Sequence, residues 1–361
     1  MIRARPHVAA MEAYALPDVS APAGKRLISL ALNESALPPS PNAITAGSKA
    51  LASGQLYATE GWSDLRDAIA EAHNLSCDDI LCSGGSMALI ETTMRCFAGP
   101  GDQVLASQYS YAFLRVAALA AGAQYAAAPE EDFTVSIDAL LAAVQPATRI
   151  VCLVNPGNPT GTRIPRSEVV RLRDGLDDDI LLLIDEAYGE FTDQPGERTF
   201  DLTERGNTVI LRTFSKAYAL AGMRVGWGIY PAALRREMLK LLGGNTVSIA
   251  AEAAAAAAMR DQAYMRNVCD ETSRRRGRFM AQLRNLGFDV PESHTNFVLV
   301  RLASADAAAK ADHMLRSEGY VLRGMGIYGL PECLRATIGA QEDMDAVAGL
   351  LGNWLKEGNN T

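Results

Sequence analysis

Apolar and polar positions along the middle of the chain alternate between two patterns. Continuous apolar runs, such as 149–154 and 180–185, are typical of parallel strands buried on both faces. Between these runs, apolar residues recur at helical spacing and predict intervening helices. The expected strands are 103–107, 123–128, 149–154, 180–185 and 208–211, and the expected helices are 111–121, 136–144 and 166–174. A helix between two strands brings the chain back to the same edge of the sheet, so the strands run parallel and the crossovers are right-handed. The pattern therefore predicts an α/β fold with a mostly parallel sheet.

The pattern changes on both sides of this region. Prolines and Gly24 prevent any long element in residues 1–26, which we expect to form an arm. A short strand is expected over 27–34. After Pro231 we expect helices to about 242, over the alanine-rich run 249–259 and over 266–286, with strands at 296–301 and 334–338. These elements predict a large domain at 40–240 and a smaller α+β domain made of 27–39 and 241–361.

Length, charge and cysteine usage narrow the class of protein. The 361 residues allow roughly two domains, at about 150 residues each. The net charge of -8 argues against nucleic-acid binding, which needs a basic face. Six cysteines without a Cys-x-x-Cys pair and four scattered histidines give no metal-ligand spacing, and no apolar segment follows the first arginines as it would in a signal peptide. We therefore expect a reduced, cytoplasmic protein without a metal site or a membrane span.

The stretch 211–226 carries the first sign of chemistry. An apolar strand leads into a turn of small residues that presents Lys216, with the hydroxyls of Thr213 and Ser215 beside it and Arg224 eight residues later. An amine held on a rigid turn near a fixed cation suits a Schiff base to a phosphorylated aldehyde. Taken alone, this stretch also fits a solvated lysine at the surface.

Two neighbouring strands end in further polar groups. The run 180–185 ends in Asp185, which Tyr188 follows, and a loop fixed by proline and glycine places Asn158 after the run 149–154. Ligands bind outside the carboxyl ends of the strands in open α/β sheets. We therefore expect these side chains to meet Lys216 in one crevice.

A glycine turn supplies a candidate anion site. The strand expected at 80–83 runs through two glycines into an amphipathic helix. Backbone N–H groups and the positive end of the helix dipole at such a start suit a phosphate. We expect Gly85, Ser86 and Met87 to form this phosphate loop.

Three segments together resemble a known family. They are Asn-Pro-Gly-Asn-Pro-Thr-Gly at 155–161, Asp-Glu-Ala-Tyr at 185–188, and Arg-Thr-Phe-Ser-Lys-Ala at 212–217 with Leu-Ala-Gly-Met-Arg at 220–224. In order and spacing they resemble the pyridoxal-phosphate aminotransferases of fold type I, class I/II, and most closely the histidinol-phosphate aminotransferase group. The resemblance implies an aspartate-aminotransferase-like, three-layer α/β/α large domain. It also implies ping-pong transfer of an amino group from a donor, with histidinol phosphate favoured, to a 2-oxo acid such as 2-oxoglutarate.

The resemblance also implies roles for the residues around the cofactor, pyridoxal 5'-phosphate. Lys216 would bind the cofactor and move the substrate proton, Asp185 would pair with the pyridine nitrogen, and Asn158 and Tyr188 would hydrogen-bond the ring oxygen. The residues expected at the cofactor phosphate are Gly85, Ser86, Met87, Thr213, Ser215 and Arg224. Tyr109 would stack on the ring. Tyr57 would reach the phosphate from a partner subunit, which implies a homodimer with shared sites.

The resemblance assigns the substrate to the smaller domain and the arm. Arg335 and Arg323 match arginines that hold the substrate carboxylate or phosphate, and a planar guanidinium suits an oxyanion because it can donate two parallel hydrogen bonds. Tyr14 on the arm and Asn33 at the mouth of the site match further substrate contacts.

Three other interpretations stay open. Ser35 departs from the family's segment at the mouth of the site, so an aromatic or other amino acid is an alternative donor. A lyase resembling threonine-phosphate decarboxylase is a second alternative. A non-enzymatic binding or regulatory protein is the third, and intact Lys216, Asp185 and Asn158 argue against it.

Overall fold

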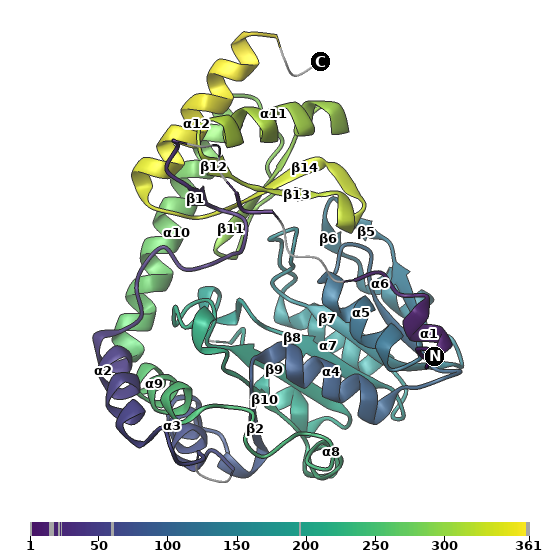
Figure 1. The fold of residues 1–361 in the computed structure, drawn as a ribbon. Helices are drawn as coiled ribbons and strands as arrows, with labels where there is room; N and C mark the ends of the chain where they lie inside the picture. Colours follow the sequence, from purple (N-terminus) through teal and green to yellow (C-terminus); the bar gives the residue numbers. More distant parts are fainter. Residues whose placement is uncertain are drawn as a thin grey trace.

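A twisted seven-stranded sheet lies at the centre of the computed structural model, which describes residues 2–13, 18–20, 22, 24–58, 61–194 and 196–358 (Figure 1). Its strands, in spatial order, are β2 (Ile80–Ser83), β10 (Gly226–Ile229), β9 (Thr208–Thr213), β8 (Leu181–Asp185), β7 (Thr148–Val154), β3 (Gln103–Ser107) and β4 (Gln124–Ala128). Neighbours from β9 to β4 are parallel, whereas β10 runs antiparallel to both β9 and β2. The predicted mostly parallel sheet is confirmed.

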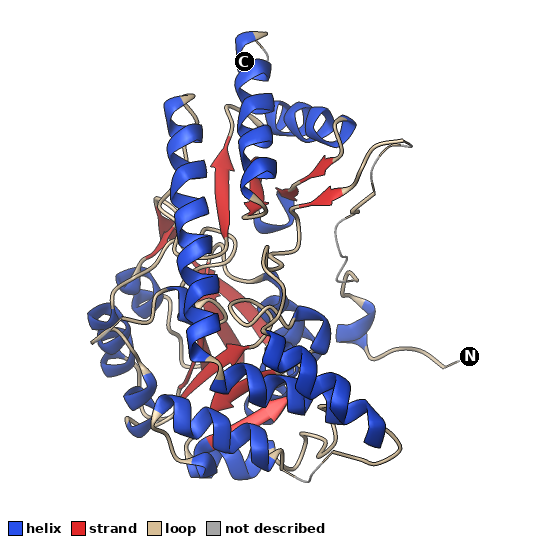
Figure 2. Ribbon diagram, turned by 90° about the vertical axis from the view of Figure 1, so that its left-hand side faces the viewer, coloured by secondary structure: helices blue, strands red, loops and turns tan. Residues whose placement is uncertain are grey.

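Helices cover the sheet to give three α/β/α layers (Figure 2). The helices of this part of the chain include α2 (Pro41–Ala50), which packs against α9, and α3 (Ser63–His73), α4 (Ser86–Phe97), α5 (Ala112–Ala120), α6 (Ile137–Ala142), α7 (Arg166–Gly175), α8 (Ala232–Met238) and α9 (Ile249–Arg260). The central strands are buried along their whole length, and their apolar side chains join those of the helices in one large core. This burial explains why the sequence shows continuous apolar runs instead of alternation.

A second core lies above the sheet in the view of Figure 1. Its three-stranded antiparallel sheet has the order β11 (Phe297–Arg301), β14 (Leu330–Thr337), β13 (Arg323–Met325), with α11 (Ala305–Ser317) and α12 (Gln341–Lys356) against it. The short β1 (Ile28–Ser29) pairs in parallel with β12 (Tyr320–Val321). Two further short strands, β5 (Glu130–Glu131) and β6 (Thr134–Val135), form a hairpin, and α1 (Pro6–Ala9) lies on the arm.

One long helix, α10 (Gln262–Asn285), connects the two cores. Met265 and Cys269 near its start are buried in the large core, whereas Phe279 and Leu283 near its end are buried in the second core. The sequence-based start of this helix, at 266, is four residues late. In the described ranges, no helix is both long and apolar enough to cross a membrane.

Two expectations about strands need correction. The strand expected over 27–34 extends only over Ile28–Ser29, because the chain then turns and Asn33 takes a left-handed backbone with φ of 54°. Arg335 was expected at the start of a strand but lies inside β14, which begins at Leu330. Pro331 does not prevent this because it lies near the strand's first residue.

Candidate active site

A cavity of about 550 Å³ opens at the carboxyl ends of β7, β8 and β9, under β13 and β14. The side chains around it come from both cores. The sequence-predicted residues in its wall are Asn33, Ser86, Met87, Asn158, Asp185, Tyr188, Thr213, Ser215, Lys216, Arg224, Arg323 and Arg335. Strand ends far apart in the sequence thus converge on one crevice, as expected for an open α/β sheet.

Lys216 lies in the turn after β9. Its Nζ donates to the carbonyl of Asn33 at 2.8 Å and lies 3.4 Å from that of Leu32. Burial, together with the positive charge of Arg335, lowers the pKa of Lys216 to about 7. A substantial fraction of this amine is therefore neutral at neutral pH, as a nucleophile or base requires.

Asp185 is the last residue of β8, and Tyr188 follows three residues later. Asp185 is buried, its Oδ1 accepts the N–H of Ala187 at 3.0 Å, and burial raises its pKa to about 6. Burial destabilises the ionised form of this carboxyl group, and a positively charged partner would stabilise that form again. Tyr188 is also buried; its hydroxyl accepts from Nδ2 of Asn33 at 2.8 Å, and burial raises its pKa.

A candidate anion cradle forms where α4 begins. Within the described part of the chain no side chain caps the start of α4, and Gly85 precedes it with φ of 98°. The first N–H groups of a helix have no partner within the helix. A Cβ on Gly85 would lie 2.6 Å from Nη2 of Arg224, so a glycine lets this guanidinium approach the helix start. The helix start and Arg224 thus lie side by side.

Two hydroxyls complete this cradle. Nη1 of Arg224 donates to Oγ of Ser215 at 3.3 Å, and Oγ1 of Thr213 donates to the same oxygen at 3.0 Å. A helix start, a guanidinium and two hydroxyls suit a phosphate dianion. With Lys216 and Asp185 in the same cavity, the residues fit the pyridoxal phosphate that the family resemblance implies.

A second group of cations faces the same cavity from the small sheet. Nη1 of Arg335 donates to Oδ1 of Asn158 at 2.6 Å, and Nη2 donates to the carbonyl of Ala31 at 3.0 Å. Nε of Arg335 is buried without a hydrogen-bond partner among the described residues. Arg323 lies directly across the strand pair from Arg335 and is also buried. Two buried guanidiniums side by side favour an anionic ligand.

Tyr109, expected to stack on the cofactor, is not part of the cavity wall. A turn after β3, in which the N–H of Ser110 donates to the carbonyl of Ser107, directs Tyr109 to Phe133, with ring centroids 6.0 Å apart. Tyr111 lines the cavity instead, at the N-cap of α5. The geometry of this chain therefore does not support the ring-stacking role expected of Tyr109.

The remaining predicted residues lie elsewhere. Gly85 precedes Ser86, and because it has no side chain it leaves room for Arg224 beside the start of α4. Tyr57 is 85% exposed and outside the cavity of its own chain. Tyr14 lies outside the described residues. Sequence reasoning missed Tyr328, a cavity residue in the turn Gly326–Tyr328, whose flanking glycines were the available signal.

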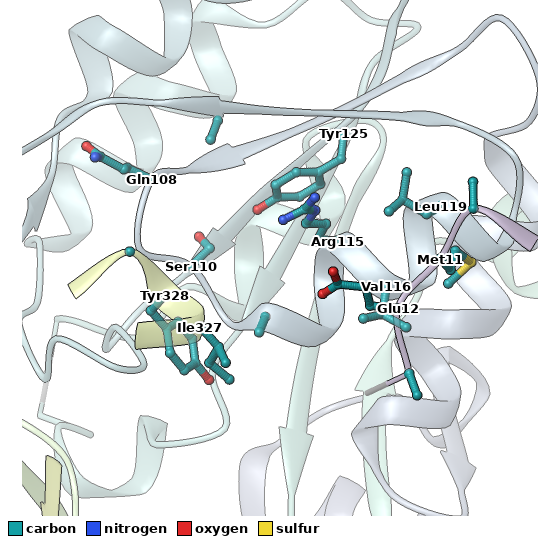
Figure 3. Close-up of a pocket in the computed structure, with 15 residues that line it drawn as sticks. Met11, Glu12, Gln108, Ser110, Arg115, Val116, Leu119, Tyr125, Ile327 and Tyr328 are labelled. Atoms are coloured by element: carbon teal, nitrogen blue, oxygen red, sulfur yellow. The ribbon is translucent and has the colours of Figure 1, made fainter. Parts of the chain in front are cut away.

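A larger cavity of about 880 Å³ lies beside the first, and Tyr328 belongs to both walls (Figure 3). The arm residues Met11 and Glu12, Arg115 of α5 and Tyr125 of β4 line it. Figure 3 shows Arg115 beside Tyr125 near the middle of the lining residues, with Tyr328 on one side of them and Met11 on the other. Because neither Lys216 nor Asp185 reaches it, we place the chemistry in the smaller cavity.

The comparisons with known proteins agree with this geometry. The sequence model of the family described as aminotransferase class I and II matches residues 25–351. This chain belongs to that family. The aminotransferase is 39% identical over 346 residues to the histidinol-phosphate aminotransferase of Rhodospirillum centenum, a match that covers 95% of this chain and 96% of the relative.

Solved structures place the aminotransferase in the same fold. It is similar to histidinol-phosphate aminotransferase from Sinorhizobium meliloti in complex with pyridoxal-5'-phosphate, with a TM-score of 0.91, 28% identity, and 99% and 98% of the two chains covered. It is also similar to aspartate aminotransferase from Thermus thermophilus with maleate, with a TM-score of 0.86, 18% identity, and 98% and 100% covered. The expected aspartate-aminotransferase-like fold type I is confirmed.

Proposed function

We propose that this aminotransferase uses pyridoxal 5'-phosphate to move an amino group from histidinol phosphate to a 2-oxo acid such as 2-oxoglutarate. The observation that carries the proposal is the presence of two anion sites around one lysine. The cradle at Ser86 and Arg224 suits the cofactor phosphate, and the pair Arg323 and Arg335 suits an anionic group of the substrate. The names of the relatives support histidinol phosphate as the donor.

The side chains divide the work of the reaction. When bound, pyridoxal phosphate withdraws electrons from the substrate carbon that bears the amino group. Nζ of Lys216 would take the proton from that carbon and deliver a proton to the cofactor carbon that binds the amino nitrogen, which the lowered pKa of Lys216 permits near neutrality. Asp185 would hold a positive charge on the ring nitrogen, while Asn158 and Tyr188 would orient the ring oxygen. Arg335 and Arg323 hold the substrate's anionic group.

We propose a homodimer in which Tyr57 completes the phosphate site of the partner. Tyr57 is 85% exposed, and the apolar side chains of Ile44, Leu51 and Leu56 on and after α2 are at least half exposed. A group of exposed apolar side chains beside an exposed tyrosine supports contact with a second copy.

An aromatic amino acid is the second candidate donor. Tyr111 and Tyr328 line the cavity, and aromatic rings in a substrate pocket suit an aromatic side chain. A decarboxylating lyase is the further alternative, and it differs in product because it would release carbon dioxide.

The donor is tested by single half-reactions. We expect histidinol phosphate to convert the visible absorption band of the lysine-bound cofactor more efficiently than phenylalanine or tyrosine does. Arg335→Met should lose this preference because it removes one of the two cations. Conversion by aromatic amino acids alone would replace the proposed donor, and carbon dioxide from threonine phosphate would identify a lyase.

Three expectations stay predictions. The limits 40–240 for the large domain, and 27–39 with 241–361 for the small one, are the first; the large core also takes in α9 and the start of α10, as far as Cys269, which lie after residue 240. A substrate contact by Tyr14 and a cytoplasmic location await direct tests.

A further inference from the structure

Arg212 on β9 is buried on the face of the strand opposite to Thr213. Side chains of successive strand residues point to opposite faces, so Thr213 faces the cofactor cavity and Arg212 faces away from it. The side chain of Arg212 is 1% exposed. Its Nε and Nη2 donate to Oε2 of Glu186 at 2.9 and 2.6 Å, and its Nη1 and Nη2 donate to the two carboxylate oxygens of Asp193 at 3.0 and 2.9 Å.

The two carboxylates belong to the loop that carries the cofactor residues. Residues 186–193 follow β8 directly, so Glu186 is adjacent to Asp185, and Tyr188 lies between the two anchors. Asp185 and Tyr188 face the cavity, whereas Glu186 and Asp193 face Arg212. One guanidinium therefore holds the loop from behind at two points.

Close packing leaves this guanidinium little freedom. Its Cζ lies 4.8 Å from the centre of the Phe200 ring. On the loop side, a Cβ added to Gly189 would overlap Cζ of Arg212. The backbone of Gly189 is not in the left-handed region, so contact with Arg212 is the reason for a glycine at this position.

Further charged groups lie around this arrangement, among them the half-exposed Arg198. Arg198 approaches Asp193 at 3.7 Å and adds a second cation, while Glu186 and Asp193 supply two anions. Glu190 lies 3.4 Å from Nη1 of Arg212, and burial raises the pKa of Glu190 to about 7. Removal of Arg212 alone would take from Glu186 and Asp193 the buried cation that both share, and this cost in a low-dielectric interior favours a displaced loop.

We infer that Arg212 is a positioning residue that fixes the loop 186–193 and thereby sets Asp185 and Tyr188 against the cofactor. Arg212 does not touch the cavity and acts through Glu186 and Asp193. The inference rests on the cofactor residues proposed above.

Three variants test this role, with a matched control. Arg212→Met removes the charge, Arg212→Lys keeps the charge but loses the planar fork, and Gly189→Ala keeps every charge but displaces the guanidinium. Arg173→Met is the control: Arg173 is also buried, and it donates to the carbonyls of Leu176 and Ile180 before the start of β8. For each protein we would measure the Kd for pyridoxal phosphate and, without cofactor, the hydrogen exchange of the amides at 186–193.

We expect Arg212→Met and Gly189→Ala to raise the Kd on the order of tenfold, with faster exchange at 186–193, because coupled residues of one network typically contribute that much. The Kd and the exchange rate of Arg212→Lys should lie between those of these two variants and those of the wild type. Arg173→Met should lower the temperature of unfolding and keep the wild-type Kd.

Two outcomes would overturn the inference. One is wild-type cofactor binding and exchange in Arg212→Met and Gly189→Ala; the other is an equal loss of binding in Arg173→Met, which would indicate general destabilisation. If the wild-type protein binds no pyridoxal phosphate, the proposed function fails, while the exchange at 186–193 still decides whether Arg212 holds the loop.

Discussion

At the scale of single residues, the protonation of Lys216 decides when the amine can react. Its pKa of about 7 means that the neutral amine increases as the pH rises through 7, whereas an ordinary lysine stays charged until well above pH 9. We expect the rate of pyridoxal phosphate uptake by the cofactor-free protein to rise through about pH 7. In Arg335→Met the rise should move to higher pH, because a neighbouring positive charge is lost. A rise only near pH 10 in the wild type would contradict this.

At the scale of elements, the sequence predicted strands better than the turns that follow them. The runs at 149–154 and 180–185 correspond to β7 and β8 because burial on both faces imposes continuous apolar residues. The turn after β3 is set by local hydrogen bonds, so the exchange of Tyr109 for Tyr111 in the cavity could not be predicted from spacing. The pattern of apolar residues does not encode such hydrogen bonds in a turn.

The same limit applies to Arg212 and Asn33. A charged residue inside an apolar strand gives no sign of its partners, and those of Arg212 lie 19 and 26 positions away in the chain. Asn33, whose backbone is left-handed, contacts Lys216 through its carbonyl and Tyr188 through its side chain. Only the folded chain shows these links.

At the scale of the whole molecule, the proposed dimer makes each site depend on two chains. Tyr57→Ala and Lys216→Ala should each lower activity. After the two variants are mixed and allowed to exchange subunits, activity should exceed the sum of the separate variants, because one site of each mixed dimer has both Lys216 and the partner's tyrosine. Activity equal to that sum, with exchange confirmed by mass, would place Tyr57 outside the partner's site.

The central claim is that Lys216 is the residue that binds pyridoxal phosphate. The most direct measurement is reduction of the cofactor-loaded protein with borohydride, followed by peptide mass spectrometry. We predict a pyridoxyl group on the peptide that contains Lys216, and its loss when histidinol phosphate is added before the reduction. A stable label on another lysine, or no label on a protein that has been supplied with the cofactor, would contradict the account.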